Sequence, residues 1–214
     1  MILQAASKGF FHVLASSRTL KALASRYGMR EGSGFARRFI AGETVEEAIE
    51  AARQIEKSGL MVTLDFLGES VASIAEADAA TRAYITVLEK VAAAGIERNI
   101  SLKLTQLGLT VDRATCVDNL RRVLDAAAAK EFFVRIDMEN SPYTDATLAI
   151  LETLWQQGHH HIGTVIQTCL KRSEGDIRRL NALGARVRLV KGAYWDSEIK
   201  RAQIDGLDGY PVAV

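Results

Sequence analysis

Short β-rich runs alternate with helical patterns from Leu60 onward, and this rhythm limits the fold more than any other feature of the sequence. The runs predict strands over residues 60–65, 100–104, 132–138, 162–167 and 186–191, whose starts lie 40, 32, 30 and 24 residues apart. Each interval holds one helical pattern, so the units predict parallel strands joined by right-handed crossovers. The spacing fits both an open doubly wound sheet and a (β/α)8 barrel, and it supplies about five of the eight units of a barrel.

A helical segment precedes the first predicted strand. Residues 1–58 are expected to be helical, and the clearest helix begins after Thr44, where Glu47 completes a capping box. Gly59 is expected to stop this helix. We therefore expect a helical N-terminal segment over residues 1–58 and a βα-repeat domain over residues 59–214.

Composition narrows the class of protein. The chain has 214 residues, of which 48% are hydrophobic and 25% are charged, with a formal net charge of +1. A nearly neutral chain has no general attraction for nucleic acid. Its two cysteines do not form a CxxC pair, and no apolar stretch is long enough to span a bilayer. These features favour a reducing, cytoplasmic setting.

Polar side chains recur where the predicted strands end. The carboxyl ends of parallel strands meet at one edge of a sheet, where ligands bind in βα-repeat folds. Charged groups are rarely buried without a partner, so a ligand site at this edge is favoured over a purely structural role. The strand-end residues are Asp65, Lys103, Asp137, Glu139, Gln167, Arg188 and Lys191.

The last predicted strand continues into the sequence "RLVKGAYW". Gly192 permits a close backbone approach, and Tyr194 and Trp195 offer flat stacking surfaces. Together with the donors and acceptors of the neighbouring strand ends, this stretch predicts a pocket for a planar, anionic cofactor.

Two other motifs are interpreted as loops. Gly32 and Gly34 follow no predicted strand, which is not typical of a dinucleotide-binding turn. The consecutive histidines His159, His160 and His161 follow a glycine in a predicted turn and lack the spacing of metal ligands. We therefore expect no metal site.

Five segments resemble the proline dehydrogenase family, both its monofunctional members and the corresponding domain of bifunctional proline utilisation A. They are "TLDFLGESV", "SLKLTQLGL", "VRIDMENSPYTD", "GTVIQTCLKRSEGDI" and "VRLVKGAYWDSEIKRAQ", in this order, and the resemblance extends from Arg38 onward. It implies a distorted (β/α)8 TIM barrel that binds FAD, oxidises L-proline to 1-pyrroline-5-carboxylate and passes electrons to membrane quinone. It also implies a 1-pyrroline-5-carboxylate dehydrogenase as partner and peripheral contact with the inner membrane face.

The resemblance assigns roles to the strand-end residues. Lys103 matches a lysine that helps to hold the proline carboxylate. Asp137 matches an aspartate beside flavin and substrate. Gln167 and Arg188 match residues that hydrogen-bond the isoalloxazine ring, with Arg188 near N5.

The same resemblance covers the loops. Tyr194 matches a residue near the substrate, and Asp65 and Glu69 match acidic positions of a substrate gate, where Glu69 would pair with an arginine of the last helix. The residues that match the cofactor-packing loop are Lys191, Gly192, Tyr194 and Trp195. The expected catalytic residues are Lys103, Asp137, Arg188 and Tyr194.

Two departures from the family pattern leave alternatives open. Thr168 and Cys169 stand where the family has alanine and tyrosine. The sequence stops at Val214, before three strands and a last helix that carry paired arginines in the family, so we expect a C-terminally truncated barrel. The alternatives to the flavoenzyme are a non-catalytic remnant and a Schiff-base aldolase that uses Lys103 or Lys191.

Overall fold

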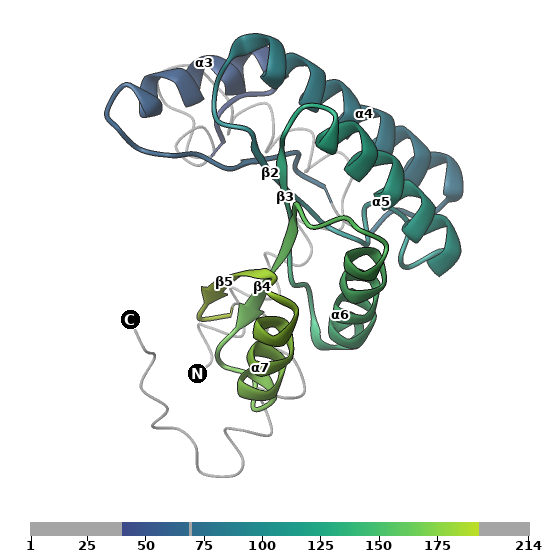
Figure 1. Cartoon of the computed structure of the whole chain (residues 1–214). Coiled ribbons are helices and arrows are strands. Elements are labelled where there is room, and N and C mark those ends of the chain that lie inside the picture. The colour runs from purple at the N-terminus through teal and green to yellow at the C-terminus, as the bar shows by residue number, and fades with distance from the viewer. Residues whose placement is uncertain (1–39, 69, 193–214) are drawn as a thin grey trace, which may run out of the picture. The chain divides into compact units, whose positions relative to one another are not determined.

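The computed structural model describes residues 40–68 and 70–192, which are coloured in Figure 1. The chain divides into two compact units, Met1–Lys57 and Ser58–Val214. In the first unit, helix α3 spans Val45–Glu56, and the Thr44 side chain accepts a hydrogen bond from the backbone N–H of Glu47 at its start. The predicted N-cap role of Thr44 is therefore confirmed, and the Glu47 carboxylate accepts from the backbone N–H of Glu43 at 2.8 Å, one residue before the position that a full capping box uses. The remainder of the predicted helical segment, residues 1–39, lies outside the described residues.

The second unit contains a five-stranded parallel sheet with strand order β1-β2-β3-β4-β5. The strands are β1 (Leu64–Asp65), β2 (Asn99–Leu102), β3 (Phe133–Ile136), β4 (Ile162–Gln167) and β5 (Arg186–Val190). One helix connects each pair of neighbouring strands, in the order α4 (Ile74–Ala94), α5 (Arg113–Ala128), α6 (Ser141–Gln156) and α7 (Ser173–Leu183). The predicted alternation of parallel strands and helices is confirmed (Figure 1).

The first strand is shorter than predicted. Residues 60–63 lie outside β1, which pairs with β2 through Leu64↔Ile100 and Asp65↔Ser101 alone. By this register Thr63 lies opposite Asn99, the first residue of β2, so residues 60–62 have no neighbour in β2 with which to pair. Apolar β-branched composition predicted a longer run, but strand length is set by the partner.

The core lies between the sheet and the helices. Val134 and Ile136 of β3 are fully buried, whereas Phe133 and Arg135 alternate with them and are partly exposed. This alternation separates the helix-covered face of the strand from the opposite face. Burial of each such aliphatic side chain stabilises the fold by roughly 1.5–3 kcal/mol.

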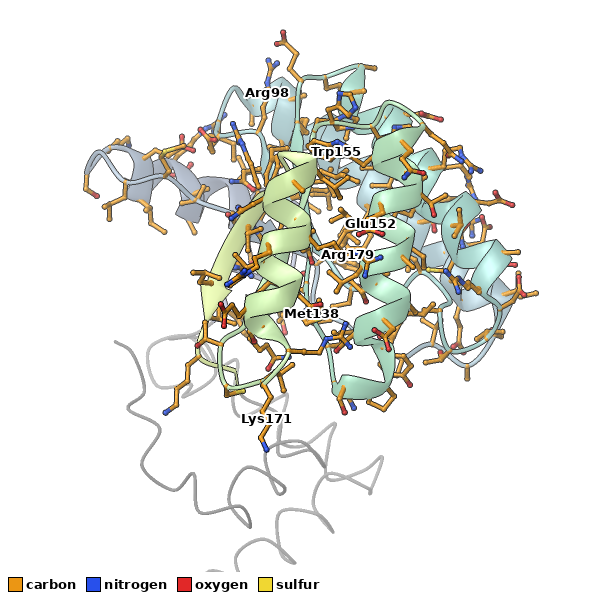
Figure 2. The ribbon with its side chains drawn as sticks, turned by 60° about the horizontal axis from the view of Figure 1, so that its bottom comes forward. Arg98, Met138, Glu152, Trp155, Lys171 and Arg179 are labelled. Carbon is orange, nitrogen blue, oxygen red and sulfur yellow. The ribbon has the colours of Figure 1, made fainter. Side chains whose placement is uncertain are left out.

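The helical layer is held together by packing and by ion pairs. Helix α4 packs against α5, and α7 packs against β4 and β5. Figure 2 shows Arg179 of α7 and Glu152 of α6 pointing toward each other, and the two side chains form an ion pair. This pair joins two consecutive helices. Because the side chain of Arg179 is half exposed, the pair contributes little to the stability of the fold.

Candidate active site

The sheet register brings charged residues of neighbouring strands together at the carboxyl edge. Leu102 pairs with Ile136, and the backbone N–H of Asp137 donates to the carbonyl oxygen of Leu102 at 2.8 Å. Lys103 and Asp137 therefore leave their strands side by side. Arg188 lies on β5, two strands away from Asp137, and its long side chain crosses the intervening strand.

Four of these side chains form a continuous charged cluster. The ammonium group Nζ of Lys103 lies 3.1 Å from Oδ2 of Asp65 and 3.4 Å from Oδ2 of Asp137. The other oxygen of Asp137, Oδ1, accepts a hydrogen bond from Nη2 of Arg188 at 2.9 Å. The exposed fractions of the side chains are 18% for Lys103, 17% for Asp137, 25% for Asp65 and 40% for Arg188. The cluster therefore combines two cations and two carboxylates in a setting that is largely shielded from water.

The shielding changes the pKa values within this cluster. Burial raises the pKa of Asp65 above its ordinary value, and the attraction of Lys103 offsets part of that rise. Burial alone would lower the pKa of Lys103, but the carboxylates of Asp65 and Asp137 together raise it above its ordinary value. Lys103 thus remains an ammonium ion at neutral pH and can bind an anionic group.

A second set of polar residues follows the cluster along the chain. Thr105 and Glu139 come two residues after Lys103 and Asp137, beyond the ends of β2 and β3, and their side chains are in contact. The Oε1 atom of Glu139 accepts from the backbone N–H of Thr105 at 3.2 Å, and Oε2 accepts from its hydroxyl at 2.5 Å. Gln167 donates from Nε2 to the carbonyl oxygen of Glu139 at 3.0 Å. The sequence pattern gave Glu139 no specific role and did not single out Thr105.

Gly192 is required at its position. Its φ of +103° lies in a region that side chains rarely adopt, and a Cβ atom there would lie 2.4 Å from Sγ of Cys169 and 2.9 Å from Oε1 of Gln167. The backbone N–H of Cys169 also donates to the carbonyl oxygen of Lys191 at 3.0 Å. The chain after β5 therefore passes directly over the end of β4, and the sulfur of Cys169 fits beneath it.

These residues fit a planar cofactor with a polar edge. The Nε atom of Arg188 is buried, and no described residue accepts its hydrogen bond. A buried donor of this kind usually has a partner, so a ligand acceptor explains it. The side chain of Gln167 is buried at the end of β4, beside the position that Gly192 keeps open.

The predicted site residues separate into two groups. The structure brings Asp65, Lys103, Asp137 and Arg188 into contact, and Gln167 and Gly192 lie together at the end of β4. Lys191 is exposed. The predicted residues Glu69, Tyr194 and Trp195 lie outside the described residues.

The three histidines are bound to the backbone or packed together. A ring nitrogen of His160 lies 3.1 Å from the carbonyl oxygen of Trp155, and one of His161 lies 3.0 Å from that of Leu124. Within residues 40–68 and 70–192, no group of three or more histidine, cysteine or acidic side chains is arranged to hold a metal ion. The same part of the chain contains no helix that combines the length and apolarity needed to cross a membrane.

A parallel βα-repeat sheet with a shielded lysine, arginine and aspartate cluster at its carboxyl edge defines an α/β protein of the class whose ligand sites lie at the strand ends. The chain belongs to the proline dehydrogenase family, because the model of that family, described as proline dehydrogenase, matches residues 48–214. The five parallel strands and the four helices that connect them in the described residues are those of the TIM-barrel type of fold that this family has.

Individual relatives agree with this assignment. The chain is 37% identical over 187 residues to proline dehydrogenase 1 of Bacillus subtilis, and the aligned region covers 87% of this chain and 61% of the relative. It is 35% identical over 227 residues to bifunctional protein PutA of Escherichia coli, covering 92% of this chain and 17% of that protein. The crystal structure of proline utilization A from Bdellovibrio bacteriovorus inactivated by N-propargylglycine matches with a TM-score of 0.70 and 29% identity, over 81% of this chain and 22% of that one. The chain thus spans about three fifths of the single-function relative.

Proposed function

We propose that the protein oxidises L-proline to 1-pyrroline-5-carboxylate with FAD as cofactor, and that residues 59–214 form much of the FAD- and proline-binding domain. The proposal depends mainly on the shielded ammonium group of Lys103, which lies within 3.4 Å of the carboxylates of Asp65 and Asp137. Asp137 in turn pairs with Arg188. A site of this kind in a member of the proline dehydrogenase family has the charges that an amino acid substrate needs.

Lys103 would hold the substrate carboxylate. Its raised pKa keeps it cationic, and its three N–H donors exceed the two contacts that it makes with Asp65 and Asp137. Asp65 and Glu69 are the proposed acidic residues on the entrance side, and Tyr194 is proposed to line the substrate. A fixed carboxylate orients the ring carbon that loses hydride, and orientation of this kind lowers the barrier.

Arg188 and Asp137 would serve the cofactor. The guanidinium of Arg188 supplies a cation that Asp137 fixes through Nη2, and its Nε is a buried donor that no described residue uses. Such a cation stabilises negative charge that develops during hydride transfer. FAD, when bound, supplies the acceptor of the two electrons that leave proline. The residues proposed to hold it are Asp137, Gln167, Arg188, Lys191, Gly192, Tyr194 and Trp195.

The Schiff-base aldolase is the weaker alternative. A lysine forms a Schiff base as the neutral amine, which requires a lowered pKa. Asp65 and Asp137 raise the pKa of Lys103 instead, so this residue is poorly suited to that chemistry.

Electrons are proposed to pass to membrane quinone, which requires peripheral contact of a cytoplasmic protein with the inner membrane face. The similarity to bifunctional PutA supports a functional link to a 1-pyrroline-5-carboxylate dehydrogenase.

The test is reduction of bound flavin by substrate in the native holoprotein under anaerobic conditions. L-proline should bleach the flavin absorbance with saturation, and D-proline should not. Tight flavin binding without any response to L-proline would refute the proposed substrate. Purified protein without flavin, and without affinity for added FAD, would refute the cofactor.

A further inference from the structure

The Thr105 hydroxyl connects three parts of the site edge. It donates to Oε2 of Glu139 at 2.5 Å, and it accepts a hydrogen bond from the backbone N–H of Ser70 at 3.0 Å. The carbonyl oxygen of Thr105 accepts a second hydrogen bond from the next backbone N–H, that of Val71, at 3.3 Å. Thr105 therefore holds the segment that leads from β1 into α4 against the ends of β2 and β3.

This segment needs an external anchor. Ser70 has a φ of +53°, an uncommon backbone conformation for a residue other than glycine. Its conformation persists only where surrounding contacts determine it. Thr105 supplies two of these contacts, and Thr110 supplies another from the exposed side by donating to the carbonyl oxygen of Val71 at 3.0 Å.

Glu139 extends the same network toward β4. Its carboxylate is buried and accepts both hydrogen bonds from Thr105, and its carbonyl oxygen accepts from the Gln167 carboxamide. The Ser173 hydroxyl in turn donates to the carbonyl oxygen of Gln167 at 2.6 Å. These buried hydrogen bonds connect the ends of β2, β3 and β4, and the half-buried bond from Ser70 to Thr105 adds the segment that follows β1.

We propose that Thr105 and Glu139 are positioning residues, which fix Lys103 and the segment Ser70–Ala72 on one side of the site and the Gln167 carboxamide on the other. Thr105 follows Lys103 by two residues on the same chain segment, so an error in its position moves the ammonium group that would bind the proline carboxylate. The kinetic part of this inference rests on the proposed proline oxidation, whereas the positioning part does not.

The chemistry of Thr105 separates a positioning role from simple packing. Its side chain is fully buried, so bulk water does not replace a lost partner. Thr105→Val preserves the shape but removes the donor to Glu139 and the acceptor for Ser70. Thr105→Ser keeps both hydrogen bonds and removes a methyl group. If packing alone mattered, serine would be the more harmful change.

The first arm of the test is amide hydrogen exchange of the native holoprotein without substrate. Thr105→Val should speed exchange in the peptide that contains Ser70 and Val71 about tenfold, the order of effect of one buried hydrogen bond. Thr105→Ser should restore the slow rate. Glu139→Gln leaves one acceptor oxygen for the two Thr105 donors and should change exchange in the same direction as Thr105→Val. Thr153→Val, on the exposed face of α6, is the matched control that should leave this peptide unchanged.

The second arm is steady-state kinetics with L-proline. Thr105→Val should raise KM more than it lowers kcat, because Lys103 binds the carboxylate in both ground state and transition state. Glu139→Gln keeps a polar side chain of the same shape at the buried position, so it tests the proposal even where Thr105→Val does not fold. Unchanged exchange at Ser70 and Val71 in Thr105→Val, or in Glu139→Gln if Thr105→Val does not fold, would overturn the positioning role. If the wild-type protein shows no response to proline but the variants still exchange faster at Ser70 and Val71, the proposed function is refuted and the positioning role is supported.

Discussion

Replacement of Lys103 by methionine is the change that most directly probes the charged cluster. Methionine preserves much of the length of the side chain and removes its charge. The lost group makes contacts of 3.1 Å and 3.4 Å with Asp65 and Asp137, which then have Arg188 as their remaining cation. A charge-assisted hydrogen bond to a carboxylate contributes about 1.5–3 kcal/mol, so the dissociation constant for proline should rise roughly 10- to 150-fold.

The effect on stability should be smaller. The side chains of this cluster are 17–40% exposed, which lies between surface pairs and fully buried pairs. We therefore expect a loss of about 1–2 kcal/mol in the free energy of unfolding, between the typical values for those two classes. FAD content should remain close to that of the wild type, because Lys103 is assigned to the substrate.

The assay is anaerobic titration of bound-flavin absorbance with L-proline, together with flavin content per chain and urea unfolding. Lys90→Met, on the exposed surface of α4, is the matched control and should behave like the wild type. Loss of FAD from Lys103→Met, with normal proline affinity in the remaining holoprotein, would show that Lys103 serves the cofactor or the fold instead.

Three other predictions follow from single positions. Arg188→Met should slow flavin reduction by proline roughly 100- to 1000-fold in stopped-flow experiments, the cost of removing one preorganised donor from developing charge, and unchanged kinetics would exclude this role. Gly192→Ala should lower FAD content because a Cβ atom would lie 2.4 Å from Sγ of Cys169, and a variant with Cys169→Ala as well should recover part of it; no recovery would point to backbone strain at φ +103° as the cause. Burial raises the pKa of the Cys116 thiol to about 12, so Cys116 should resist alkylation in the native protein at pH 8.5 and react after unfolding; equal rates in both states would contradict its burial.

The sequence predicted the fold better than it predicted the contacts. Strand–helix alternation and the Thr44 N-cap depend on residues close together in the sequence, and the structure agrees with both. The length of β1 depends on where β2 begins, which no local pattern of residues 60–65 contains. This explains why residues 60–62 of the predicted strand lie outside β1.

The site shows the same division. A polar residue at each strand end predicted one ligand-binding edge, but the Asp137–Arg188 pair depends on the register of β3, β4 and β5 together. Thr105 carries no charge and follows an apolar leucine, so composition gave no reason to single it out. Its importance comes from burial between a carboxylate and a backbone N–H, which are 34 and 35 residues away along the chain.

We propose that one cluster of strand-end residues binds both proline and FAD, and a crystal structure of the native holoprotein with a bound, unreactive carboxylate analogue of proline would test this. We expect the carboxylate of the analogue to lie within hydrogen-bonding distance of Nζ of Lys103, and the Arg188 guanidinium to contact the isoalloxazine ring. An analogue bound away from Lys103, or a flavin that does not contact Arg188, would contradict it.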